Sequence, residues 1–64
     1  METNLKSARL AAGLSQSQLA AAVGMSVRTL QAYESGARDL KKAAAETVLA
    51  LARETGTTVE FLIT

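Results

Sequence analysis

Apolar residues recur every three or four positions along most of this 64-residue chain, and glycines interrupt the pattern. This spacing places apolar side chains on one face of an α-helix. No stretch alternates between apolar and polar residues for long enough to indicate a strand. The first helix is expected from Leu5 to Ala12, with Asn4 as its N-cap and Gly13 as its end. The pattern therefore predicts an all-α protein.

The second and third helices are predicted to meet at a sharp turn around Gly24. Ser15 and Gln18 have the spacing of a capping box, which predicts that the second helix begins just after Ser15. Gly24 can adopt the left-handed backbone conformation that closes a helix. Ser26 then offers an N-cap for the third helix, and Met25 is expected to be buried where the two helices meet.

Two more helices are predicted in the last third of the chain. The fourth is expected to begin near Asp39 as its N-cap and to end at Gly56. The residues at helical spacing that would form its apolar stripe are Leu40, Ala44, Val48, Leu51 and Ala52. Thr57 and Glu60 have the spacing of a second capping box, which predicts a short fifth helix through residues 61–63.

Composition argues against several kinds of functional site. The chain has no cysteine and no histidine. Zinc sites need one of these residues, and most proton-transfer sites use histidine. The hydroxyls of Ser15 and Ser26 are explained as helix caps, and no lysine is evidently placed to activate them as nucleophiles. We therefore expect no enzyme activity, no metal and no cofactor.

Length and hydropathy indicate one small domain spanning residues 1–64. A chain of this size buries a modest core, so helix propensity and dimerisation both matter for its stability. No apolar run approaches the roughly 20 residues of a membrane-spanning helix, and the N-terminus has no signal-peptide pattern. These features predict a cytoplasmic protein with no membrane partner.

The distribution of charge is more informative than the net charge of +1. Residues 1–42 carry six Lys or Arg against three acids, or +3, whereas residues 43–64 carry one Arg against three acids, or −2. A basic first part suits a protein with one face on a polyanion. Solvated charge without a function would account for these numbers equally well.

The third helix is predicted to expose a distinctive face. At about 100° per residue, Leu30 and Tyr33 mark its buried side. The opposite side carries Arg28, Gln31 and Ala32, flanked by Val27. Arginine can bind guanine, glutamine can pair with adenine, and small apolar side chains can contact the thymine methyl group. An ordinary solvated helix face is the alternative for these residues alone.

The stretch QSQLAAAVGMSVRTLQAYES, residues 16–35, resembles the helix-turn-helix of the phage Cro and repressor family, also called Xre-like. The matching positions are apolar Leu19, Val23, Met25, Leu30 and Tyr33, small Ala20, and Gly24 at the turn. GLSQ before this stretch, YESG at its end and GTTVEFL near the C-terminus also resemble the family. The resemblance implies a five-helix lambda-repressor-like DNA-binding domain, with the helix-turn-helix at the second and third helices.

The resemblance also implies which residues meet double-stranded DNA. Gln16 would hold a phosphate and support the third helix, the recognition helix. The residues implied to face the DNA are Ser26, Val27, Arg28, Gln31 and Ala32, and those implied to follow its backbone are Arg38, Lys41 and Lys42. Two features depart from the family: Ala32 replaces a longer polar side chain that many members have, and the loop ARDLKK lacks a frequent proline.

Arg9 lies on the apolar stripe of the first helix, where a buried arginine needs a partner. The resemblance implies a buried ion pair between Arg9 and Glu34, and the alternative is that Arg9 extends to water. For a homodimer, Val59 and Leu62 around the fifth helix are the candidate interface residues, with Phe61 expected in the core.

The function implied is sequence-specific binding of double-stranded DNA, as a transcriptional repressor that acts as a homodimer on a two-fold operator. An antitoxin-like autoregulator and a protein-interaction module with the same fold are the alternatives. No small-molecule substrate is evident.

Overall fold

The computed structural model describes residues 3–64 and contains α-helices joined by short turns. The elements are α1 (Asn4–Ala11), α2 (Gln16–Val23), α3 (Val27–Ser35), the 3₁₀ helix η1 (Leu40–Lys42), α4 (Ala45–Thr55) and α5 (Val59–Ile63). Residues 3–64 include no strand, so the all-α prediction is confirmed. None of these helices has the length and apolar character needed to cross a membrane.

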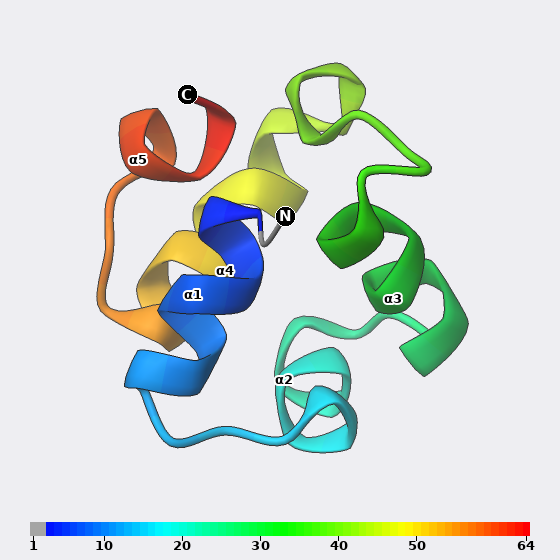
Figure 1. Ribbon diagram of the computed structural model, residues 1–64, viewed down its shortest axis with the longest axis vertical. Coiled ribbons are helices and arrows are strands. Elements are labelled where there is room, and N and C mark those ends of the chain that lie inside the picture. The colour runs from blue at the N-terminus through cyan, green and yellow to red at the C-terminus, as the bar shows by residue number, and fades with distance from the viewer. Residues whose placement is uncertain (1–2) are drawn as a thin grey trace.

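The helices surround a core to which each element from α1 to α5, η1 included, contributes a buried leucine. α1 and α4 lie near the centre of Figure 1, α2 lies below them, α3 lies on the right and α5 lies at the upper left. α2 packs against α3 and α4, while α1 contacts α3, α4 and α5. The core leucines that are at most 1% exposed are Leu5, Leu19, Leu30 and Leu51. α3 is therefore held by one face, and its other face is left at the surface.

The capping box predicted at the start of α2 is confirmed. The Ser15 hydroxyl accepts a hydrogen bond from the Gln18 backbone N–H at 3.0 Å, and the Ser15 N–H donates to Gln18 Oε1 at 2.8 Å. These two bonds satisfy backbone groups that have no partner within the helix. They define where α2 begins.

The sharp turn between α2 and α3 is also confirmed. Gly24 ends α2 with φ of +74°, a conformation that is strained for residues with a Cβ atom. The Met25 N–H donates to the Ala20 carbonyl at 3.0 Å, which closes the end of the helix. Met25 packs against the core, and Ser26 caps α3 by accepting from the Thr29 N–H at 3.1 Å. The turn thereby sets the position of α3.

The predicted start of the fourth helix is wrong. Asp39 caps η1 instead, because its carboxylate accepts from the Lys41 N–H at 3.0 Å. The chain then becomes extended at Ala43 and Ala44, and α4 begins only at Ala45. The apolar stripe is not continuous: Leu40 is buried from η1, whereas Ala44 is exposed. Two separate elements thus bring Leu40 and the α4 side chains to the core.

The N-cap of α1 is Thr3 rather than Asn4. The Thr3 hydroxyl accepts from the Lys6 N–H at 3.2 Å and donates to the Glu34 carbonyl at 2.9 Å, so it also joins α1 to α3. The Asn4 amide has another role, since it donates to the Phe61 carbonyl at 2.8 Å. Asn4 therefore fastens α1 to α5 near the C-terminus.

The predicted cap of the fifth helix is wrong by one residue. Thr57 follows the end of α4 and closes it, because the Thr57 N–H donates to the Ala52 carbonyl at 2.9 Å. Thr58 caps α5 by accepting from the Phe61 N–H at 3.1 Å. In the resulting helix Leu62 is 5% exposed and Phe61 is 43% exposed, the reverse of the predicted placement. Leu62 packs within the core and offers almost no surface to a second copy.

Candidate nucleic-acid interface

The exposed side of α3 carries one positive charge and no negative charge. Arg28 and Gln31 are exposed, and Val27 and Ala32 beside them are half-buried. Leu30, 0% exposed, faces the core on the opposite side. The helix contains a single acid, Glu34, and that side chain points inward with 4% exposure. Four of the five side chains that the family resemblance implies to face DNA therefore lie on one accessible surface of α3, which we name the α3 face: Val27, Arg28, Gln31 and Ala32.

Glu34 is held by Arg9 in a buried, two-pronged ion pair. Arg9 Nε donates to Glu34 Oε2 at 2.6 Å, and the Arg9 terminal nitrogen donates to Oε1 at 3.2 Å. The other terminal nitrogen donates to the Leu14 carbonyl at 2.8 Å. The Arg9 and Glu34 side chains are 9% and 3% exposed, so Arg9 does not extend to water. The pair fixes α3 to α1 and to the loop before α2.

Gln16 joins this pair to the surface of α3. Its Nε2 group donates to Glu34 Oε1 at 3.1 Å, and its Oε1 accepts from Gln31 Nε2 at 3.2 Å. Gln16 is itself half-buried at the start of α2. The first residue of α2 is thus joined to α3 by two side-chain hydrogen bonds.

Ser26 lies at the N-terminus of α3, and its hydroxyl is already engaged in the helix cap. Besides accepting from the Thr29 backbone, the hydroxyl donates to the Thr29 hydroxyl oxygen at 2.9 Å. Ser26 is exposed, which leaves its position open to a neighbouring phosphate. Unpaired N–H groups at a helix N-terminus favour anions in general.

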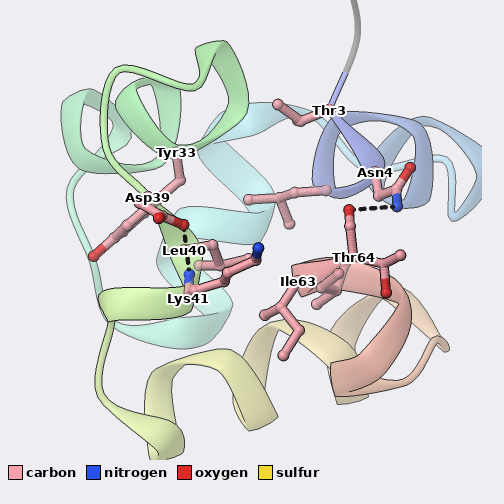
Figure 2. Close-up of a pocket in the computed structure, with 10 residues that line it drawn as sticks. Thr3, Asn4, Tyr33, Asp39, Leu40, Lys41, Ile63 and Thr64 are labelled. Atoms are coloured by element: carbon pink, nitrogen blue, oxygen red, sulfur yellow. Dashed lines mark hydrogen bonds between the residues drawn. The ribbon is translucent and has the colours of Figure 1, made fainter.

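Three cations follow α3 along the chain, and their side chains have different surroundings. The Arg38 guanidinium lies 5.1 Å from the centre of the Tyr33 ring, a cation–π contact, while Arg38 stays exposed. Lys41 and Lys42 are exposed on η1. Figure 2 shows the Lys41 side chain pointing into a pocket of about 390 Å³ that Asn4 also lines. Lys41 therefore extends toward the C-terminal end of the chain rather than freely into solvent.

The buried ion pair makes the surface more one-sided than the sequence totals suggest. Arg9 and Glu34 neutralise each other inside the protein. Among residues 1–42 the remaining charged residues are five cations, Lys6, Arg28, Arg38, Lys41 and Lys42, and two acids, Glu2 and Asp39. Surface cations at this ratio favour contact with a polyanion.

An apolar groove opens between η1, α4 and α5. Its volume is about 370 Å³, and Leu49, Val59 and Ile63 line it together with Leu40 and Val48. Leu49 is 43% exposed, and Val59 and Ile63 are half-buried. We name Leu49, Val59 and Ile63 the α4–α5 groove. Val59 from the predicted dimer interface lies in it, whereas sequence reasoning missed Leu49 because the position lies outside the predicted stripe.

Comparison with known proteins identifies the family. The helix-turn-helix family model of the Cro/C1 or Xre-like type matches residues 5–62, which is nearly the whole chain. No curated protein and no solved structure matches the chain. The five α-helices found in residues 3–64 and the turn at Gly24 fit the lambda-repressor-like fold of this family. The chain belongs to the Cro/C1-type helix-turn-helix family, whose members are DNA-binding regulators.

Proposed function

We propose that this protein is a sequence-specific repressor that binds double-stranded DNA as a homodimer on a two-fold operator. The observation that carries the proposal is the α3 face: an arginine and a glutamine exposed on a helix whose only acid is buried. In this family the second helix of the motif enters the major groove and its N-terminal residues contact base edges. Arg28 lies in the first turn of α3, at that position.

In this proposal Arg28 binds guanine and Gln31 lies beside it, while Val27 and Ala32 let the helix enter the groove. Gln16, Ser26, Arg38 and Lys42 contact phosphates around it. In this proposal the chain is a single DNA-binding domain with no catalytic role. It acts in the cytoplasm, as the sequence predicts.

Selection of binding sites from random double-stranded DNA tests this proposal. We expect recovery of a two-fold symmetric sequence whose half-sites lie about one helical turn apart. Binding should weaken as salt rises, because phosphate contacts release counterions. Failure to enrich any sequence, together with no retention on nonspecific DNA at low salt, would favour the protein-interaction module instead.

Lys42→Ala is expected to weaken binding to all DNA sequences equally. Lys42 is exposed on η1, and loss of one phosphate contact should reduce the slope of log K against log salt by about 0.9 for each subunit. Titrations at several salt concentrations measure this slope. Arg53→Ala is the matched control, since Arg53 is an exposed cation on α4 in the acidic part of the chain. Equal slopes for Lys42→Ala and the unaltered protein would remove Lys42 from the contact.

The α4–α5 groove is the surface we assign to the second copy. It is apolar, and α5 lies on the opposite side of the molecule from α3 in Figure 1, so a partner placed there leaves the α3 face free. A protein this small gains stability from covering such a surface. A two-fold operator requires two copies in a fixed relation, and one apolar surface used by both copies supplies it.

Leu49→Asp is expected to weaken binding to the full operator by more than about 1 kcal/mol, since it places a charge at the centre of the apolar contact. Binding to an isolated half-site should not change, because Leu49 lies on α4 and is 43% exposed. Leu10→Asp is the control, an exposed leucine on α1. Gel-shift titrations with both duplexes measure the difference. Equal loss with Leu10→Asp would contradict the assignment of the groove.

A further inference from the structure

A chain of hydrogen bonds connects the buried core to the exposed side of α3. It runs from Glu34 through Gln16 to Gln31, with bonds of 3.1 Å and 3.2 Å. Glu34 is 4% exposed, Gln16 is half-buried and Gln31 is exposed. We name these three residues the amide relay. It begins at a side chain whose position Arg9 has already fixed.

The chemistry of the groups determines which way each amide faces. A carboxylate that accepts from Arg9 has only acceptor oxygens, so Gln16 must turn its NH₂ group toward Glu34. The Gln16 oxygen is then directed at Gln31, where it can only accept. Gln31 must therefore present its NH₂ group to Gln16. The buried acid sets the orientation of an amide two residues away along the relay.

This orientation defines what Gln31 offers to a ligand. Its Oε1 lies on the side of the amide away from Gln16 and acts as an acceptor, and one N–H of its NH₂ group is still available. In the major groove, adenine presents a donor at N6 beside an acceptor at N7, which is the complement of these two groups. Guanine presents acceptors at both O6 and N7, so it offers no donor to Oε1.

We propose that the amide relay makes Gln31 a specificity-determining residue for adenine, with Gln16 as the positioning residue that fixes its polarity. This inference rests on the proposed function, because it concerns which base the α3 face selects. Its physical basis is preorganisation: an amide held in one orientation does not need to be ordered on binding. A freely rotating glutamine could instead turn its NH₂ group toward guanine.

The relay can be tested in the free protein, without DNA. Nuclear magnetic resonance of the side-chain amides reports their mobility through the ¹⁵N–¹H nuclear Overhauser effect. We expect the Gln31 amide to be restricted in the unaltered protein and to become mobile in Gln16→Met. Ser17→Ala, an exposed neighbour on α2, is the control and should leave it restricted. Equal mobility of Gln31 with and without the Gln16 amide would overturn the relay.

Site selection then tests the consequence for recognition. The unaltered protein should prefer adenine at one position of each half-site by at least about fivefold. Gln16→Met should lose most of that preference while the guanine position read by Arg28 is kept, and Gln31→Met should lose the preference completely. An unchanged preference in Gln16→Met, or a preference for guanine at that position, would overturn the inference. No binding by any variant or by the unaltered protein would instead refute the proposed function, and the resonance experiment would still judge the relay.

Discussion

Glu34→Ala is expected to lower the free energy of unfolding by about 3–5 kcal/mol, since it leaves the Arg9 charge buried without its partner. The same change removes the acceptor of the Gln16 amide. A small domain has a total stability of roughly 5–15 kcal/mol, so this loss is a large part of the whole. Thermal and urea unfolding of the variant measure it directly.

A double variant separates the ion pair from other contributions of Glu34. Arg9→Met combined with Glu34→Leu should be less damaging than Glu34→Ala alone, because no buried charge is left unpaired. Glu46→Ala is the control, as Glu46 is an exposed acid in the first turn of α4. Small losses that simply add for the two single variants would contradict a coupled pair.

Arg28→Ala is expected to cost about 1–3 kcal/mol in binding to the selected operator and to relax the preference at one base pair in each half-site. The reason is its position: Arg28 is the exposed cation of α3 and lies in the first turn, and arginine can donate two hydrogen bonds to guanine. Titration of the selected operator and a scrambled duplex measures both effects. Stability should change little, because the side chain is exposed.

Arg28→Lys distinguishes base recognition from charge. Lysine keeps the positive charge but lacks the planar, two-pronged donor, so we expect affinity to recover in part while specificity does not. Arg28 could instead hold a phosphate, which positions a helix without selecting sequence. An equal loss of affinity on both duplexes in Arg28→Ala would show that role, and base recognition would then pass to Val27 and Gln31.

Local signals in the sequence predicted the elements around the recognition helix well. The capping box of Ser15 and Gln18, the stop at Gly24 and the cap at Ser26 all occur as predicted. Each of these depends on one or two neighbouring residues with a strong conformational preference. For this reason the turn that sets the position of α3 could be predicted from the sequence alone.

The second half of the chain was predicted less well, because its signals are weaker or ambiguous. α4 begins after Ala44, which makes no side-chain cap, so nothing in the local sequence indicates its start. Thr57 and Thr58 are adjacent and both can cap a helix, and the choice depends on the end of α4. A shift of one residue rotates a helix by about 100°, which exchanged the predicted places of Phe61 and Leu62.

The side-chain contacts of the candidate site join residues from different helices, so the periodicity of the sequence could not predict them. Family resemblance suggested the pair of Arg9 and Glu34, residues that are 25 positions apart. No pattern in the sequence indicated that Gln16 would bond to both Glu34 and Gln31, since polar contacts between helices leave no periodic signal. The direction of the Lys41 side chain could not be predicted from the sequence either. It points into a pocket because the C-terminal end of the chain, which is distant in sequence, lies beside it.

The most direct test of the account is the affinity of the unaltered protein for its selected operator against that for a scrambled duplex of equal length and composition. The account predicts binding to the operator at least about 10³-fold tighter at physiological salt, with affinity for both duplexes falling as salt rises. Equal affinity for the two duplexes would contradict sequence recognition by the α3 face, and no affinity for either would contradict DNA binding itself.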